Sequence, residues 1–230
     1  MEELNIQNQR DTMNSSSKLV LYNFSHSSCS WRVRFALKLK GLDYEYKAVN
    51  LVKGEQFSRE FEQVNPLHYV PVLVDGDVVV SDSLAILLKN ILREHLLPDD
   101  HQRKALNLQV ASIVCSSIQP LHMVTLAKHI EEKVGPEEGI LWALSIIEKG
   151  FYALEKLLKD FATRFATGEE LYMADMFLAP EIDTVAKRYN IDMSAYPILN
   201  RVYEAYKTVP EFLAASPEAQ PDAAFFTPPA

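Results

Sequence analysis

The segment LVLYNFSHSSCSWRVRFALKLKG, residues 19–41, decides the fold of this 230-residue chain. It begins with an apolar run typical of a buried β-strand, and a group of small hydroxyl and thiol side chains follows. Residues 31–40 then have the apolar spacing of a helix, which the final glycine ends. The first amides of a helix have no partner within it and carry partial positive charge. This strand, loop and helix therefore predict a site for a phosphate, a carboxylate or a thiolate near Ser27, Ser28 and Cys29.

The sequence up to residue 97 predicts further elements around this segment. Residues 44–49 alternate and are rich in aromatic and β-branched side chains, so they indicate a second strand that completes a βαβ unit. Pro71 cannot donate a ladder hydrogen bond, so we expect it at a strand edge or start, with a cis peptide bond as one alternative. The other predicted elements are a helix over residues 59–64, a hairpin of residues 70–74 and 78–80, and a helix from residues 82–83 to 91.

The second half of the chain has helical patterning, and no strand pattern follows residue 97. The apolar face from Ile140 to Phe161 is expected to lie in the core. Both ends of the chain lack periodicity, because the first is polar and the last is rich in proline. The predicted organisation is a disordered tail over residues 1–17, an α/β unit (βαβ-α-ββ-α) over residues 18–97, an all-α domain over residues 98–216 and a flexible tail over residues 217–230.

Composition and charge narrow the range of functions. The formal net charge of −8 and the pI near 5.3 argue against nucleic acid and anionic lipid as partners, because both would be repelled. Two cysteines cannot form a disulfide framework, and the six histidines show no metal-ligand spacing, so no metal is predicted. The sequence has neither an apolar run long enough to span a membrane nor the apolar core of a secretion signal. We therefore expect a cytoplasmic protein without membrane or nucleic-acid partners.

The eight residues SSCSWRVR, 27–34, resemble the signature of the zeta class of cytosolic glutathione transferases, the glutathione-dependent maleylacetoacetate isomerases. The resemblance covers residues 18–222 and includes Asn65-Pro66, Val70-Pro71 and Met173-Ala174-Asp175. It implies the architecture of that superfamily, a thioredoxin-like α/β domain followed by an all-α helical bundle. It also implies a homodimer that uses glutathione as its cofactor and a small electrophilic acid as its substrate.

The resemblance assigns roles to the residues that match the family. Ser27 is expected to hydrogen-bond the glutathione thiol and favour its thiolate, with Ser28 and Cys29 beside it as further catalytic candidates. The implied cofactor-binding residues are Ser27, Ser28, Cys29, Arg32, Gln56, Val70, Asp82, Ser83 and Gln119. Maleylacetoacetate, the substrate that the resemblance implies, carries two carboxylates, so cations should line the second half of the site, and the candidates are His26, Arg32 and Arg188.

The implied chemistry is that of a thiolate nucleophile. The thiolate would add to the double bond of an activated enone, the new single bond would rotate, and elimination would return the trans isomer. The expected reaction converts maleylacetoacetate to fumarylacetoacetate, and a halogenated acid would be dehalogenated by the same thiolate. Two alternatives stay open: a non-catalytic glutathione-binding or ligand-binding protein on the same fold, and thiol transfer by Cys29. The residue types also fit plainer roles, since serine is a common helix N-cap and a lone cysteine is usually an inert buried thiol.

Four positions depart from the family pattern. His26 stands where zeta enzymes usually have arginine, so a titratable ring replaces a permanent cation. Met123 stands in place of an asparagine, and residues 89–95 lack the expected pattern. Tyr172 replaces a serine or threonine cap, so Asp175 is expected to act only on the helix dipole. The first three departures are the reason for the non-catalytic alternative.

Overall fold

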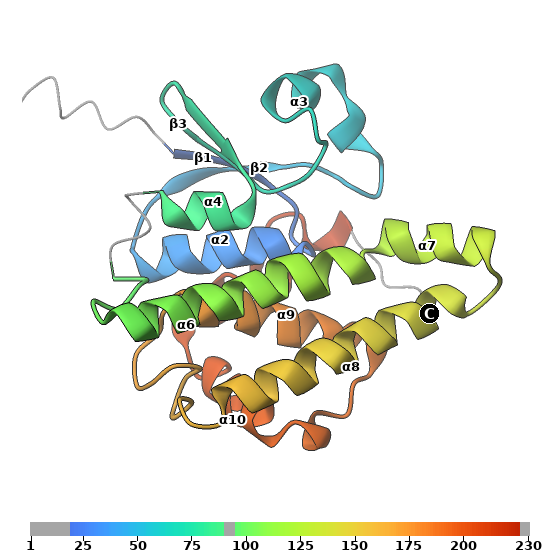
Figure 1. Cartoon of the computed structure of the whole chain (residues 1–230). Helices are drawn as coiled ribbons and strands as arrows, with labels where there is room; N and C mark the ends of the chain where they lie inside the picture. Colours follow the sequence, from blue (N-terminus) through green and yellow to red (C-terminus); the bar gives the residue numbers. More distant parts are fainter. Residues whose placement is uncertain (1–18, 90–94, 226–230) are drawn as a thin grey trace, which may run out of the picture.

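The computed structural model describes residues 19–89 and 95–225, and it divides into an α/β half and a helical half (Figure 1). The elements of the α/β half are β1 (Leu19–Asn23), α2 (Ser28–Leu39), β2 (Tyr44–Ala48), the 3₁₀ turn η1 (Glu55–Phe57), α3 (Arg59–Val64), β3 (Val72–Asp75), β4 (Val78–Ser81) and α4 (Ser83–Leu88). The elements of the helical half are α6 (His101–Ser112), the π-helical η2 (Ile113–Ile118), η3 (Gln119–His122), α7 (Val124–Lys133), α8 (Glu138–Leu158), α9 (Met173–Tyr189), η4 (Met193–Ala195), α10 (Pro197–Tyr206), α11 (Pro210–Ala214), η5 (Pro217–Ala219) and η6 (Ala223–Phe225).

The four strands form one mixed sheet in the order β2-β1-β3-β4. The central strand β1 runs parallel to β2, where Leu21 lies opposite Tyr46, and antiparallel to β3, where Leu21 lies opposite Leu73. Helices α2 and α4 lie between this sheet and the helical half (Figure 1). The predicted fold class, a thioredoxin-like α/β domain followed by an all-α domain, is confirmed, and the peptide bond before Pro71 is cis.

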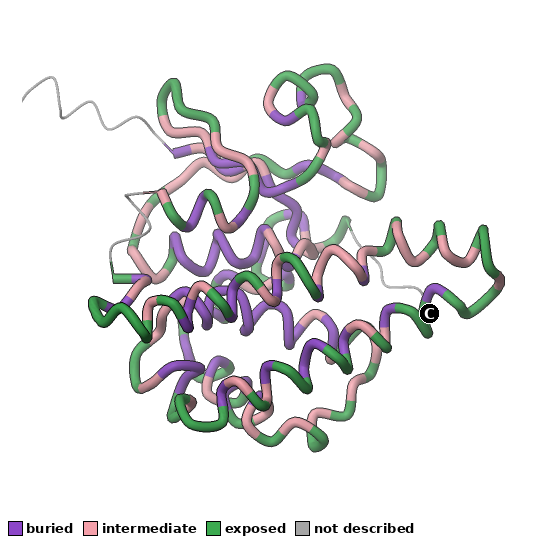
Figure 2. Tube along the Cα trace, in the orientation of Figure 1, coloured by how far each residue is buried: buried purple, intermediate pink, exposed green. Residues whose placement is uncertain are grey.

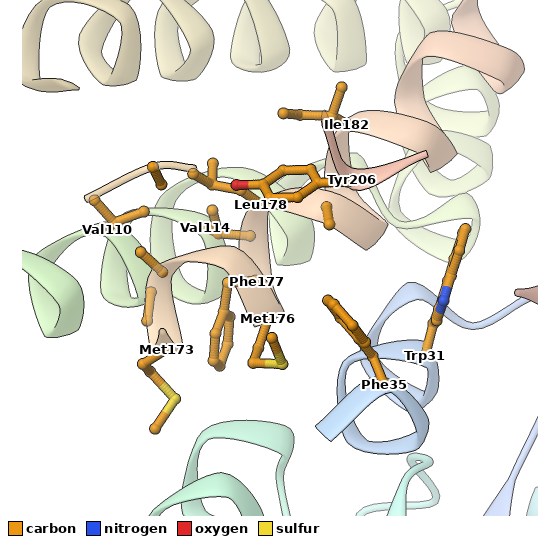
Figure 3. Close-up of a cluster of buried hydrophobic side chains, with 14 of the residues drawn as sticks. Trp31, Phe35, Val110, Val114, Met173, Met176, Phe177, Leu178, Ile182 and Tyr206 are labelled. Atoms are coloured by element: carbon orange, nitrogen blue, oxygen red, sulfur yellow. The ribbon is translucent and has the colours of Figure 1, made fainter. Parts of the chain in front are cut away.

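The hydrophobic core lies where α2 meets α9. Figure 2 shows that buried residues concentrate along these two helices in the middle of the molecule. Trp31 and Phe35 of α2 belong to the same buried cluster as Met176 and Phe177 of α9 (Figure 3). Burial of such large side chains is the main stabilising contribution to a fold. The shared core therefore fixes α2, and with it the loop at its N-terminus, against the helical half.

The apolar face predicted over residues 140–161 is buried only in its middle. Ile147 and Leu154 lie in the core, whereas 49% of Ile140 and 46% of Phe161 is exposed. The prediction is wrong at both ends. The first turn of α8 packs against α7 instead of the core, and Phe161 follows the last residue of the helix.

The C-terminal segment also differs from its prediction. Pro217, Gln220 and Asp222 are buried, and the Gln220 amide group donates hydrogen bonds to the carbonyls of Ala214 and Ser216. Asp222 also accepts hydrogen bonds from Ser25 and Tyr46, which are distant in the sequence. A flexible tail is therefore wrong for residues 217–225, because such contacts fix this segment and leave no periodic signal in the sequence.

Four predictions fall wholly or partly outside the described residues. The N-terminal tail, residues 1–17, is one of them, and residues 226–230 of the predicted C-terminal tail are another. The third is the altered stretch 89–95, of which residues 90–94 are not described. The fourth is the helix predicted from residues 82–83 to 91, of which residues 90 and 91 are not described. Its described part is observed as α4, which ends at Leu88.

Asp175 is a buried hydrogen-bond acceptor, not merely a charge on the helix dipole. Its carboxylate accepts from the amides of Tyr172 (2.8 Å) and Ala166 (2.9 Å) and from the hydroxyl of Tyr206 (2.6 Å). Burial raises the pKa of this carboxyl to about 6, although the three hydrogen bonds oppose the shift. The expectation drawn from the missing serine cap is therefore wrong, since the carboxylate itself satisfies the amide that precedes α9.

Candidate active site

Ser27 is the N-cap of α2, at the end of the loop that leaves β1. Its Oγ accepts a hydrogen bond from the Ser30 amide over 3.2 Å. A hydroxyl has one proton to donate besides its acceptor capacity, so the Ser27 proton stays available for a ligand. The N-cap role and the role of a donor to a thiolate use different parts of the same group. Ser27 can therefore perform both at the positive end of α2.

Ser28 and Cys29 occupy the first turn of α2. Ser28 is 8% exposed and Cys29 is half-buried. Burial raises the pKa of the Cys29 thiol, and the nearby Arg32 guanidinium only partly offsets this. A thiol with a raised pKa is mostly protonated at neutral pH and is a poor nucleophile. Thiol transfer by Cys29 is therefore the least favoured of the predicted activities.

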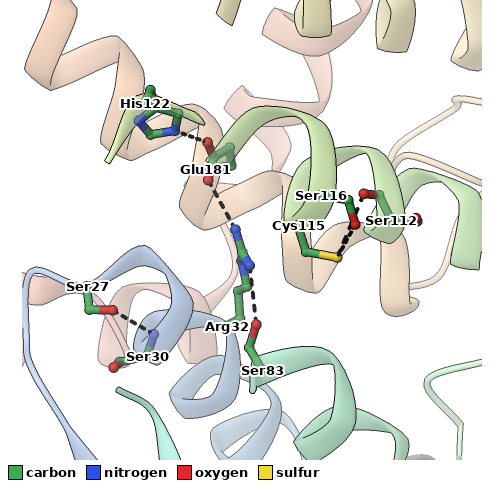
Figure 4. A network of polar contacts seen from close by, with 9 residues as sticks. All are labelled: Ser27, Ser30, Arg32, Ser83, Ser112, Cys115, Ser116, His122 and Glu181. Carbon is green, nitrogen blue, oxygen red and sulfur yellow. Dashed lines mark hydrogen bonds and ion pairs between the residues drawn. The ribbon is translucent and has the colours of Figure 1, made fainter. Parts of the chain in front are cut away.

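Arg32 joins the two halves of the molecule in a buried polar network (Figure 4). Its guanidinium donates to Ser83 Oγ from Nη1 and to Glu181 Oε2 from Nη2, each over 3.2 Å. His122 Nε2 donates to the other oxygen of Glu181 over 2.6 Å. Burial opposes ionisation of Glu181, but His122 and Arg32 outweigh it and hold the pKa of the Glu181 carboxyl below its ordinary value.

This network changes the role of Arg32. The sequence predicted a cation that contacts the substrate and the cofactor, yet Arg32 is 1% exposed and two of its nitrogens are engaged by protein groups. A buried carboxylate needs a cationic partner, and Glu181 takes Arg32 for this purpose. Arg32 thus contacts Ser83 of the site directly, and its binding of a substrate carboxylate stays a prediction.

Ser83 and Asp82 form the N-terminus of α4. Ser83 Oγ accepts from Arg32, so its hydroxyl proton also stays available for a ligand. The Asp82 carboxylate accepts from the amides of Leu84 (2.9 Å) and Ala85 (3.0 Å). Asp82 has a φ of 77°, a conformation that costs free energy in a residue with a side chain and is common at functional sites.

Val70 and Gln56, two predicted cofactor-binding residues, belong to the segment between β2 and β3. Val70 precedes β3 and takes no part in its ladder to β1, and it packs in the same small cluster as Phe24, three residues before Ser27. Gln56 Oε1 is buried and has no hydrogen-bond partner among the described residues. An unpaired buried acceptor is costly, so it suits a site that a peptide-like ligand with N–H groups completes. These groups, with Ser27 and Ser83, fit the tripeptide glutathione.

His26 and Arg188 are brought into the same electrostatic environment. Burial lowers the pKa of His26, Arg34 and Arg188 lower it further, and Glu218 and Asp222 oppose the shift. His26 is therefore mainly neutral at pH 7, where it serves as a hydrogen-bonding group, and it becomes a cation only in acid. Arg188 is exposed on the last turn of α9.

Comparison with known proteins identifies the family of this chain. Residues 26–89 match the family model of the glutathione S-transferase N-terminal domain. A zeta-class glutathione S-transferase from Euphorbia esula is 55% identical over 208 residues, which cover 89% of this chain and 92% of that protein. This chain belongs to the zeta class of glutathione S-transferases. The predicted family is confirmed, and so is glutathione, which is the cofactor of this class.

Relatives of this transferase include named isomerases. A maleylacetoacetate isomerase from Rattus norvegicus is 41% identical over 212 residues, covering 89% of this chain and 95% of the rat protein. The crystal structure of a maleylacetoacetate isomerase from Anaeromyxobacter dehalogenans 2CP-1, with glutathione in its active site, is 39% identical with a TM-score of 0.81. That match covers 90% of this chain and 99% of the other. The prediction that the chain is an enzyme is thereby confirmed.

Sequence reasoning missed Glu181, His122 and Asp222 in this zeta-class transferase. The sequence around Glu181 could have indicated its role, because this carboxylate stands within the apolar run of α9. A carboxylate buried in such a run must be paired with a cation or a hydrogen-bond donor. His122 and Asp222 had none, since their partners are distant in the sequence. Gln119 begins η3, the turn that carries His122.

The metal-site, cavity and membrane-span features of the described residues do not add to the candidate active site. No group of three histidine, cysteine, aspartate or glutamate side chains within residues 19–89 and 95–225 could hold a metal ion. A cavity of about 620 Å³ lies at the far end of α2, lined in part by Lys40, Arg164 and Glu211, and contains none of the predicted site residues. Among the described helices none alone is long and apolar enough to cross a membrane, although the bent pair over residues 101–133 reaches that length and composition.

Proposed function

We propose that this transferase isomerises a small unsaturated acid from cis to trans, and that the reaction is the conversion of maleylacetoacetate to fumarylacetoacetate. The observation that carries the proposal is the geometry of Ser27, whose oxygen accepts from the Ser30 amide and leaves the proton for a thiolate. The isomerase name of the rat relative supports the choice of substrate.

The chain's own residues would hold glutathione in an extended conformation. Bound glutathione supplies the thiol, whose ionised form adds reversibly to an activated double bond. The Ser27 hydroxyl and the positive end of α2 stabilise that thiolate. At the other end of the tripeptide, the Ser83 hydroxyl suits the γ-glutamyl carboxylate, and the Asp82 carboxylate suits its ammonium group. Gln56 Oε1 offers an acceptor to a peptide N–H.

The acid substrate would be held by Arg188, with His26 as a hydrogen-bonding neighbour. Arg188 lies close enough to lower the pKa of His26, so the two side chains belong to one electrostatic environment. The same thiolate would displace halide from a halogenated acid, which makes dehalogenation a further proposed activity. A homodimer and a cytoplasmic location stay predictions of the sequence.

Replacement of Ser27 tests the proposal. We expect Ser27→Ala to lower kcat by about 10²-fold, because removal of one preorganised hydrogen-bond donor to an anion typically lowers kcat by this factor. Glutathione is expected to bind this variant still. Turnover of maleylacetoacetate and calorimetric titration with glutathione provide the two readouts. Ser145→Ala is the matched control, because Ser145 is exposed on α8 and bonds only the Trp142 carbonyl. Undiminished turnover in Ser27→Ala would remove Ser27 from the mechanism.

The second candidate is a non-catalytic glutathione-binding protein. The lowered pKa of His26 favours it, because this position then lacks at pH 7 the permanent cation that zeta enzymes usually have there. An assay with maleylacetoacetate at saturating glutathione separates the candidates. Glutathione-dependent turnover supports the enzyme, and binding without turnover supports the alternative.

A further inference from the structure

The C-terminal segment Pro217–Phe225 packs against the loop that carries Ser27, from the opposite end of the sequence. Asp222, which is 1% exposed, lies 197 residues from its partner Ser25. We propose that Asp222 is a positioning residue: it fixes Ser25 and thereby places the Ser27 hydroxyl against the glutathione thiol. The inference rests on the proposed function of this site and adds to it a residue that does not touch the ligand.

Asp222 holds both the backbone and the side chain of Ser25. Its Oδ2 accepts from the Ser25 amide over 3.0 Å, and its backbone carbonyl accepts from the Ser25 hydroxyl over 3.2 Å. Its Oδ1 accepts from the Tyr46 hydroxyl over 2.5 Å, so β2 in turn fixes the orientation of the carboxylate. Ser25 is fully buried, and without this carboxylate its amide would lose its partner.

Arg34 holds the other side of the same loop. Its Nη1 and Nη2 donate to the carbonyls of Phe24 (3.2 Å) and Ser25 (2.8 Å), and its Nε donates to the Ala215 carbonyl (3.0 Å). Arg34 of α2 thus binds two carbonyls of the loop, and Asp222 binds the amide of Ser25. The same guanidinium ties the loop to the end of α11. The loop is fixed in two directions by groups from two separate parts of the chain, Arg34 of α2 and Asp222 of the C-terminal segment.

This fixation matters because Ser27 follows Ser25 by two residues. The Ser27 amide donates to the Phe24 carbonyl over 3.1 Å, so the loop is one tight turn in which a shift of Ser25 moves Ser27. Catalysis is sensitive to such shifts, since a displacement of about 1 Å can cost about 10²-fold in rate. The proposed action of Asp222 on the thiolate is therefore exerted through the position of Ser27.

The experiment compares Asp222→Ala with Asp222→Asn in the full-length chain. The alanine variant removes the acceptor for the Ser25 amide. The asparagine variant keeps an oxygen for that amide and removes the charge, and its NH₂ group can donate to the Tyr46 oxygen, which reverses the native hydrogen bond from Tyr46. We expect Asp222→Ala to lower kcat about tenfold or more and to change KM for glutathione less than about threefold, while Asp222→Asn stays within about threefold of the wild type.

A second readout follows the thiolate itself. Ultraviolet absorbance of glutathione bound to each variant, titrated against pH, gives the pKa of the bound thiol. We expect that pKa to rise by about one unit in Asp222→Ala and to stay near the wild-type value in Asp222→Asn. Glu218→Gln is the matched control, because Glu218 also acts electrostatically on His26 but bonds the exposed Lys187. If Asp222→Ala does not fold, Asp222→Ser replaces it, since its hydroxyl is too short to span the same distance.

Each outcome of these experiments tests the proposed function, the positioning role of Asp222, or both. A wild-type protein that binds glutathione without lowering the pKa of its thiol contradicts the proposed function and the inference together. If the wild type lowers the thiol pKa, and both that pKa and kcat are unchanged in Asp222→Ala, the inference about Asp222 is overturned and the proposed function stands. Equal losses in Asp222→Asn and Asp222→Ala also overturn it, because charge would then matter and not the position of the loop.

Discussion

At the residue scale, Ser27 and Ser83 share one arrangement. Each hydroxyl oxygen accepts a hydrogen bond from a protein donor, the Ser30 amide in one case and the Arg32 guanidinium in the other. Each hydroxyl therefore has its proton left for an acceptor on the ligand. One proton suits the thiolate of glutathione and the other its γ-glutamyl carboxylate, so the two serines define the two ends of the proposed ligand.

His26 leads to a prediction on pH. The pKa of His26 is lowered from 6.5, so its ring is neutral above that pH and gains its proton only as the pH falls below it. A protonated ring attracts anions, so the affinity for ethanedisulfonate, a permanently ionised analogue of a dicarboxylic acid, is expected to rise about threefold in acid. Calorimetric titrations with glutathione present, at about pH 5 and about pH 8, measure this difference.

Two variants complete that test. His26→Gln removes the titrating group and is expected to bind the disulfonate equally at both pH values. His26→Arg supplies a permanent cation and is expected to bind tightly at both. The same acid-induced rise in His26→Gln as in the wild type would show that another group is responsible.

At the scale of single elements, α9 connects the helical half to the site. Glu181 is fully buried within this helix, and its carboxylate is bonded by Arg32 from α2 and by His122 from η3. Removal of one member of a buried ion pair leaves an uncompensated charge, which costs more free energy than a lost surface contact. The orientation of Ser83 thus depends on a carboxylate in another domain.

The stability of Glu181 variants tests this dependence. Glu181→Ala is expected to lower the free energy of unfolding by about 3 to 5 kcal/mol, measured by urea denaturation. Folding lowers the pKa of the Glu181 carboxyl, so this group stabilises the fold above its ordinary pKa of 4.5, and that stabilisation is lost as the pH falls. The difference in free energy of unfolding between the wild type and Glu181→Ala should therefore narrow in acid. Glu204→Ala, which removes an exposed partner of Lys207, is the control and should cost about 0.5 kcal/mol or less. Equal stability of the two variants would contradict the role of Glu181.

At the scale of the whole molecule, local and long-range features differ in how well the sequence predicts them. The strands β1 and β2 and the helix α3 follow from local periodicity and turn residues, and their observed bounds match the prediction closely. Residues 27–34 likewise predict a site for a thiolate, because one short segment carries the loop and the helix terminus.

The features that the sequence did not predict are contacts between distant residues. The partner of Arg32 is 149 positions away, and the partner of Ser25 is 197 positions away. Nothing in the spacing around either residue indicates these contacts, so Arg32 was assigned to the substrate and residues 217–225 to a flexible tail. The loop that carries Ser27 is local in sequence, but its fixation is a property of the whole fold.

A structure of this transferase with bound glutathione tests the central claim most directly. The claim predicts that the glutathione sulfur lies within about 3.5 Å of Ser27 Oγ, at the N-terminus of α2, with the γ-glutamyl carboxylate at Ser83. A sulfur that instead contacts Cys29 or lies away from the Ser27 loop, with the tripeptide bound elsewhere, would contradict it.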